Sequence, residues 1–198
     1  MKASRRQFVQ GLSLAAPALL TAKVAAGQGA KEDSSSPSLK AIVILVRHTE
    51  KSTDDRVDPS LSEAGVVRAK ALARLVGSMG VTALLHTEYK RTRDTLAPLA
   101  EALELKGEEI GASEMPKLIE RIRGAKAGEV IAVAGHSNTI PAIAYALGVT
   151  LPGLDPIAKG SRAGHGNLPH GAYDRVHILT PGQTAANLVE LRYGEPSA

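Results

Sequence analysis

Two uninterrupted apolar runs restrict the fold of this chain more than any other feature of its sequence. Residues 41–46 contain no polar side chain, and residues 129–134 are apolar after Glu129. A run of this kind is typical of a strand buried on both faces, as in a parallel sheet with helices on each side. We therefore expect both runs to be buried strands of a parallel sheet.

Helical patterns alternate with the strand-like runs. Ser62 precedes a stretch, residues 66–76, in which apolar side chains recur at helical spacing, so Ser62 is expected to cap an amphipathic helix. Further helices are expected over residues 91–105, 116–123 and 139–147, and further strands over 81–86, 175–180 and 188–193. The alternation predicts a three-layer α/β/α sandwich with a mostly parallel central sheet. Residues 148–173, rich in Gly and Pro, are expected to form a functional loop.

The N-terminal segment resembles a twin-arginine signal peptide. Arg5 and Arg6 precede a stretch rich in Ala and Leu, and small residues follow at 24–26. Pro17 and Lys23 interrupt the apolar stretch before it reaches the roughly 20 residues that a spanning helix needs. We therefore expect export by the twin-arginine route and no stable membrane anchor after cleavage.

This assignment divides the chain into three parts. A signal peptide is expected over residues 1–26, a polar linker over 27–38 and a single domain over 39–198. The twin-arginine route carries folded proteins, so the domain is expected to work in the periplasm or elsewhere outside the cytoplasm.

Charge and cysteine content exclude several classes of function. Of the 24 Lys and Arg residues, four lie in residues 1–26, which contain no acid, so the remainder carries 20 basic and 20 acidic residues. A domain near neutrality has no overall attraction for polyanions, and no nucleic-acid partner is expected. The absence of cysteine excludes disulfides, thiolate metal sites and cysteine nucleophiles.

Polar residues that could carry chemistry follow the apolar runs directly. Arg47 and His48 come after the first run, Arg91 lies one helical turn beyond the strand expected at 81–86, and His136 comes after the run at 129–134. Ligands of open α/β sheets bind beyond the carboxyl ends of the strands, where these side chains should meet. A neutral imidazole can attack phosphorus while guanidinium groups hold the equatorial oxygens. The arrangement therefore suits phosphoryl transfer.

These residues resemble the three signatures of the histidine phosphatase superfamily, which is related to the phosphoglycerate mutases. The signatures are Arg47-His48, the segment from Thr87 to Thr95 and Gly135-His136-Ser137. Residues 58–65 also resemble the family's usual entry into its first helix. The resemblance implies a phosphoglycerate mutase-like fold.

The same resemblance implies a role for each residue of the site. His48 is the phosphorylated nucleophile, Arg47 and Arg91 bind phosphate, and His136 is a further donor beside the transferred group. Ser137 and Asn138 are expected to complete the phosphate-binding set. No cofactor and no metal are required.

The sequence departs from the mutase pattern at two positions. Thr49 and Asp54 stand where mutases carry a glycine and an asparagine, and the interval that holds the mutase acid is short. The resemblance therefore favours a phosphatase that acts on a phosphorylated small molecule or a phosphoprotein. A phosphomutase and a binding module that keeps the phosphate pocket without turnover are the alternatives.

The general acid is left open by the sequence. Glu50 could donate a proton to the leaving group or form a salt bridge with Arg47 or Lys51, and Asp174 could reach the edge of the site or serve as a turn residue. Two further histidines, His165 and His170, are spaced like metal ligands but lie in a Gly- and Pro-rich loop, which favours a surface position. His86 could line the pocket, and His177 is expected to pack or to face solvent.

Overall fold

The computed structural model describes residues 39–157, 165–183 and 185–197. The predicted signal peptide and the predicted linker lie outside these residues and remain predictions. Part of the predicted loop over 148–173 also lies outside them. The strands are β1 (Ile42–Arg47), β2 (Ala83–His86), β3 (Gly107–Glu109), β4 (Val130–Gly135), β5 (Arg175–Thr180) and β6 (Asn187–Arg192). The helices are α1 (Glu63–Val76), α2 (Lys90–Leu103), α3 (Met115–Arg123) and α4 (Thr139–Ala146).

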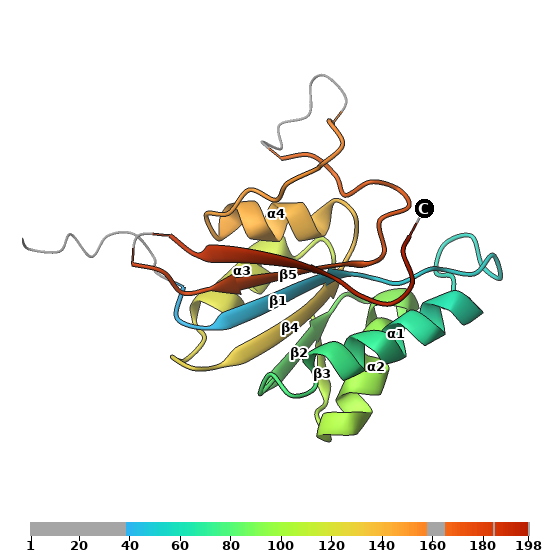
Figure 1. Ribbon diagram of the computed structural model, residues 1–198, viewed down its shortest axis with the longest axis horizontal. Helices are drawn as coiled ribbons and strands as arrows, with labels where there is room; N and C mark the ends of the chain where they lie inside the picture. Colours follow the sequence, from blue (N-terminus) through green and yellow to red (C-terminus); the bar gives the residue numbers. More distant parts are fainter. Residues whose placement is uncertain (1–38, 158–164, 184, 198) are drawn as a thin grey trace, which may run out of the picture. The chain divides into compact units, whose positions relative to one another are not determined.

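The strands form one mixed sheet in the order β3-β2-β4-β1-β5-β6 (Figure 1). The first four strands in this order are parallel, while β5 runs antiparallel to β1 and β6 antiparallel to β5. The two runs that the sequence marks as buried, β1 and β4, are neighbours at the centre. The predicted sandwich with a mostly parallel sheet is confirmed.

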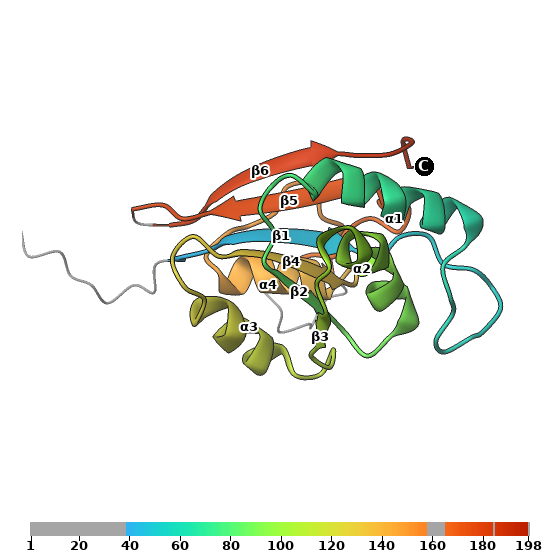
Figure 2. The ribbon, with the colours of Figure 1, turned by 90° about the horizontal axis from the view of Figure 1, so that it is seen from below.

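Helices cover both faces of the sheet, with α1 and α2 on one side and α3 and α4 on the other (Figures 1 and 2). Alternate residues of β1 point to opposite sides: Ile44 and Val46 pack with residues of α1 and α2, whereas Val43 and Leu45 pack with residues of α3 and α4. Each face of the strand therefore needs apolar side chains, which is why β1 is an uninterrupted apolar run.

The predicted strands and helices are present, with most ends within two residues of the prediction. Ser62 caps α1 by accepting a hydrogen bond from the Gly65 N–H at 3.2 Å. One strand was not predicted. The strand β3 is a three-residue edge strand in which Glu108 and Glu109 are exposed, so it carries no apolar signal and depends on its backbone pairing with β2.

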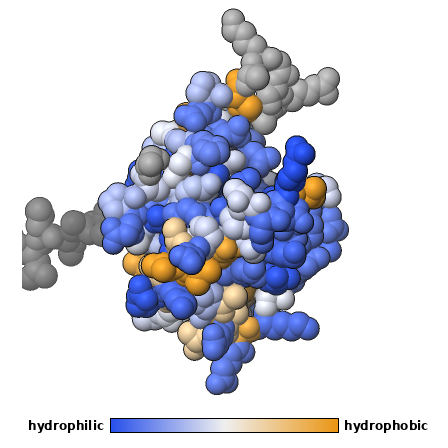
Figure 3. Space-filling view, turned by 90° about the vertical axis from the view of Figure 1, so that its right-hand side faces the viewer, coloured by the Kyte–Doolittle hydropathy of each residue, from blue (hydrophilic) through white to orange (hydrophobic). Residues whose placement is uncertain are grey.

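The surface of the domain is largely polar on the side that Figure 3 shows, and apolar residues form only small patches there. Within the described ranges, none of the helices has the length and apolar character needed to cross a membrane.

Candidate active site

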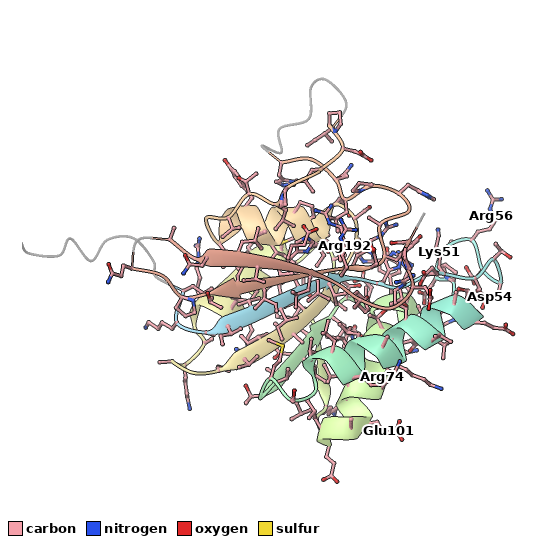
Figure 4. All side chains as sticks on the ribbon, viewed as in Figure 1. Lys51, Asp54, Arg56, Arg74, Glu101 and Arg192 are labelled. Atoms are coloured by element: carbon pink, nitrogen blue, oxygen red, sulfur yellow. The ribbon has the colours of Figure 1, made fainter. Side chains whose placement is uncertain are left out.

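The carboxyl ends of the central strands bring the predicted site residues together. His48 follows β1, His136 follows β4, and the backbone N–H of His48 donates to the Gly135 carbonyl at 2.8 Å. The ring centroids of the two histidines lie 5.5 Å apart. The loop that carries Lys51, Asp54 and Arg56 extends beyond the same end of β1 (Figure 4).

His48 is fixed in one tautomer by its own backbone. Its Nδ1 lies 2.8 Å from the Thr49 carbonyl oxygen, which can only accept a hydrogen bond, so the neutral ring carries its proton on Nδ1. The pKa of His48 is lowered to about 3, mainly by burial and also by the charges of Arg47, His136 and Arg91, against the opposing hydrogen bond to the Thr49 backbone. At neutral pH, Nε2 therefore holds a free lone pair.

Thr49 holds the peptide that follows the nucleophile. Its N–H donates to Thr95 Oγ1 at 3.0 Å, its hydroxyl donates to the Gly65 carbonyl at 2.9 Å, and the residue is fully buried. The departure from the mutase pattern at this position thus has a structural use. No local pattern indicates these contacts, because the partners of Thr49 lie 16 and 46 residues away in the sequence.

Arg47 is buried, and the protein binds only some of its guanidinium N–H groups. Its Nη1 donates to the carbonyls of Pro169 and His170 at 2.9 and 2.8 Å, and its guanidinium carbon lies 4.2 Å from the ring centroid of Tyr173. Its Nε has no hydrogen-bond partner among the described residues, and burial lowers the pKa of the group. Nη2 makes only a long contact of 3.4 Å to the Tyr173 hydroxyl, so the Nε and Nη2 edge can serve an anion.

Arg91 and His136 complete the positive side of the site. Arg91 stacks on the Tyr89 ring at 4.2 Å from its centroid, and its closest carboxylate oxygen is that of Asp58 at 3.8 Å. His136 Nε2 lies 3.1 Å from Thr87 Oγ1. Burial, aided by the charges of Arg91 and Arg47, lowers the pKa of His136 to about 4. The structure thus gathers two guanidinium groups around two neutral imidazoles.

Ser137 and Asn138 lie where β4 passes into α4. The Ser137 carbonyl accepts a hydrogen bond from the Leu168 N–H at 2.8 Å. This bond ties the late loop, by which we mean the described residues between α4 and β5, to this turn. Asn138 is exposed and precedes α4, and it lines a pocket of about 350 Å³ together with other residues of α3, α4 and the late loop. Their predicted contact with phosphate remains a prediction.

The two candidate acids are both engaged by arginines. Glu50 forms a salt bridge with Arg68, which lies 2.6 Å away and donates through Nε to both carboxylate oxygens, so the expected partners Arg47 and Lys51 were wrong. Asp174 accepts a hydrogen bond from Arg192 at 2.9 Å. Arg68 was missed because it is an unremarkable position of α1 in the sequence.

The side chains of the remaining histidines take no part in these contacts, although the His170 backbone carbonyl binds Arg47. His177 is fully buried in β5, 3.3 Å from Glu190, and His86 is buried at the end of β2 with Nδ1 2.8 Å from the Thr87 carbonyl. His165 is half-buried and His170 is exposed. No group of three or more metal-ligating side chains occurs in the described part of the chain.

Comparison with known proteins agrees with this geometry. The sequence model of the histidine phosphatase superfamily (branch 1) matches residues 43–114, a range that contains His48 and Arg91. No curated protein matches the chain in sequence.

Solved structures share the fold. One assigned as the phosphohistidine phosphatase SixA of Nakamurella multipartitia is 20% identical with a TM-score of 0.51, over 77% of this chain and 96% of its own. The corresponding Agrobacterium tumefaciens structure is 19% identical with a TM-score of 0.52, over 80% and 100%. A mycobacterial glucosyl-3-phosphoglycerate phosphatase is 15% identical with a TM-score of 0.52, over 77% and 97%.

Proposed function

We propose that this chain is a member of the histidine phosphatase superfamily and removes phosphate from a phosphomonoester or a phosphoprotein by way of a covalent phosphohistidine at His48. The observation that carries the proposal is the state of His48. Its Nδ1 proton is bound to the Thr49 carbonyl, and its pKa lies near 3, so Nε2 is available as a nucleophile.

The proposed reaction uses these groups in two steps. In the first step the Nε2 lone pair forms a bond to phosphorus, and the bond from phosphorus to the leaving group breaks with its electron pair on the leaving group. Arg47 and Arg91 offset the charge on the equatorial oxygens, and His136 lies beside them. In the second step a water oxygen attacks phosphorus, the P–N bond breaks, and His48 recovers its lone pair while the water proton is released.

The leaving group is the part of the substrate that the candidate acids restrict. Glu50 and Asp174 accept hydrogen bonds from Arg68 and Arg192, so each carboxylate is engaged by an arginine and neither is free to contact a leaving group. Leaving groups that need little protonation, such as an imidazole or a phenolate, are therefore the preferred class. The names of the SixA-like neighbours, which are assigned as phosphohistidine phosphatases, support phosphohistidine as one such substrate.

Trapping the intermediate tests the proposal. The protein is incubated with a radiolabelled phosphodonor, quenched, and assayed for label that is lost in acid and retained in base, as expected of a P–N bond. His48→Ala should abolish the label, whereas His165→Gln, a change at a half-buried residue outside the cluster, should keep it.

Three outcomes contradict the proposal in different ways. Acid-stable label, or label that persists in His48→Ala, moves the nucleophile to another side chain. A protein that binds vanadate but forms no adduct with any of several phosphodonors is a binding module. Transfer of the label to a second acceptor instead of water identifies a mutase.

A further inference from the structure

Two of the few aromatic residues of this chain lie at the candidate active site. The sequence has four tyrosines, one phenylalanine and no tryptophan. Tyr89 and Tyr173 both stand next to a site histidine: the Tyr89 ring is 5.2 Å from the His136 ring, and the Tyr173 ring is 6.1 Å from the His48 ring. We call Tyr89, His136, His48 and Tyr173 the aromatic row.

The order of the aromatic row is the order of the strands in the sheet. Tyr89 follows β2, His136 follows β4, His48 follows β1 and Tyr173 precedes β5, and these four strands are neighbours in that sequence. Because β5 is antiparallel to β1, its beginning lies at the same edge as the ends of the other three. The topology therefore places one tyrosine at each end of the pair of imidazoles.

Each tyrosine in the row supports one arginine. The guanidinium carbon of Arg91 lies 4.2 Å from the Tyr89 ring centroid, and that of Arg47 lies 4.2 Å from the Tyr173 ring centroid. At this distance a cation is attracted to the negative face of the ring. The two contacts are equal in length, although Tyr89 and Arg91 are neighbours at the start of α2 whereas Arg47 and Tyr173 are 126 residues apart in the sequence.

A ring face holds an arginine without accepting its N–H groups or neutralising its charge, both of which phosphate binding needs. A carboxylate partner would accept the N–H groups and cancel the charge, whereas a stacked ring leaves every N–H of the guanidinium free to donate. Arg47 accordingly keeps Nε unpaired in the described structure, and the contacts of Arg91 to Asp58 and Val57 are as long as 3.8 and 3.5 Å.

The tyrosines are themselves fixed by backbone contacts. The Tyr173 N–H donates to Ser197 Oγ at 3.1 Å, and the Tyr89 carbonyl accepts from Thr92 Oγ1 at 2.8 Å at the start of α2. The supports of the arginines are thus tied to the C-terminal segment and to a helix terminus.

We propose that Tyr89 and Tyr173 are positioning residues that hold Arg91 and Arg47 by their ring faces for the transferred phosphoryl group. This role rests on the proposed function. Tyr89 has the larger effect of the two, because Arg91 has only long contacts besides the ring, whereas Arg47 is also bound by the Pro169 and His170 carbonyls.

The test is a fluorination series in the full chain. Phenylalanine, then phenylalanine with one, two or three ring fluorines, replaces Tyr89 or Tyr173, and inorganic vanadate is titrated by calorimetry. Fluorine withdraws electrons from the ring face with little change in shape. The vanadate affinity of the phenylalanine variant should lie within about twofold of that of the parent. The affinity of the trifluorinated variant should be about fivefold to thirtyfold weaker.

Controls separate this role from plain packing. The same series at Tyr145, which is 53% exposed, should leave vanadate binding unchanged. Equal affinity across the series at both Tyr89 and Tyr173, in a parent that binds vanadate, overturns the positioning role and leaves the proposed function intact. A parent that binds no vanadate overturns both.

Discussion

At the scale of single residues, the site is organised by burial and by hydrogen bonds to the backbone. The pKa of His48 and that of His136 both lie below the usual value of a histidine because the rings are desolvated and face two guanidinium groups. The two imidazoles are therefore neutral, and the positive charge of the site is carried by the guanidinium groups of Arg47 and Arg91, which can bind phosphoryl oxygens.

Glu50 illustrates how a residue close to the nucleophile in sequence can have a structural use. Its carboxylate is bound by Arg68, whose side chain is 7% exposed, and Arg68 Nη1 also donates to the carbonyls of Tyr193 and Glu195. This arginine therefore links the residues after β1 to the C-terminal segment. A buried charge without its partner is costly, so the pair matters for stability.

We predict that Glu50→Gln destabilises the domain without a selective effect on the leaving group. The free energy of unfolding should fall by about 1–3 kcal/mol, because the amide leaves Arg68 without a charged acceptor. The ratio of kcat/KM on an aryl phosphate to that on an alkyl phosphate should stay at the parent value, since loss of an acid penalises alkyl esters more.

Two matched variants complete this experiment. Glu63→Gln, at an exposed position of the first turn of α1, should change neither stability nor kinetics appreciably, and Asp174→Asn should behave as Glu50→Gln does. An alkyl-ester defect confined to one variant identifies that residue as the proton donor and refutes its structural assignment.

The sequence was sufficient to identify the residues that converge here and insufficient to identify their supports. His48, Arg91 and His136 follow apolar runs, so strand ends locate them without a structure. Arg68 and Tyr173 act through contacts 18 and 126 residues away in sequence, to Glu50 and Arg47, and no local pattern encodes such a partner.

At the scale of elements, the start of α1 packs directly on the segment after the nucleophile. A side-chain carbon on Gly65 would clash with the Glu50 carbonyl oxygen, and the Gly65 carbonyl accepts a hydrogen bond from the Thr49 hydroxyl. The glycine at the end of the 58–65 segment is therefore required by the approach of helix and loop.

We predict that Gly65→Ala loosens this junction. The added methyl must push α1 away from Glu50, which should lower the free energy of unfolding by about 1–3 kcal/mol and reduce kcat/KM through displacement of Thr49 and His48. Thermal unfolding and steady-state kinetics measure the two effects.

The control for Gly65→Ala is Gly111→Ala. A methyl at Gly111 would meet the flexible side chain of Glu114 at 3.1 Å, which can move aside, so this variant should resemble the parent. Parental stability and activity in Gly65→Ala would show that the junction yields without cost and would remove the explanation of the glycine.

The helices and strands were predicted where burial produces a recognisable pattern of apolar residues, and β3 was missed because its side chains are not buried. The central strands β1 and β4 are buried on both faces, and their apolar runs follow from that. The edge strand β3 has one neighbour and exposed side chains, so its three residues read as a polar connection. Its existence depends on hydrogen bonds to β2, which a sequence pattern does not report.

At the scale of the whole described domain, the sheet order determines which residues meet. Strands β2, β4, β1 and β5 place four side chains from distant segments in one row, and the C-terminal segment returns to brace the last of them through Ser197. The site is therefore a property of the entire sheet edge, and stability and activity are coupled through it.

One consequence is that the domain should lose stability as the solution becomes mildly acidic. His48 and His177 are buried and His136 is half-buried, and this desolvation holds the pKa of each below the value of about 6.5 expected in the unfolded chain. Below about pH 6.5 these histidines therefore bind protons in the unfolded chain but remain neutral in the folded domain. Their contribution to stability is complete above pH 6.5 and declines as the pH falls toward the folded values, near 3 for His48 and 4 for His136.

We predict a free energy of unfolding that falls between pH 6 and 5 by about 1.4 kcal/mol per pH unit for each of these histidines. Urea unfolding of the parent, His48→Asn, His136→Asn and His165→Gln across this range measures the slope. The first two variants should each have a shallower slope than the parent, because each removes one group that must gain a proton on unfolding, while His165→Gln should match the parent. If the three slopes coincide with that of the parent, the neutral imidazoles do not contribute to acid sensitivity, and the argument that burial keeps His48 ready as a nucleophile loses its basis.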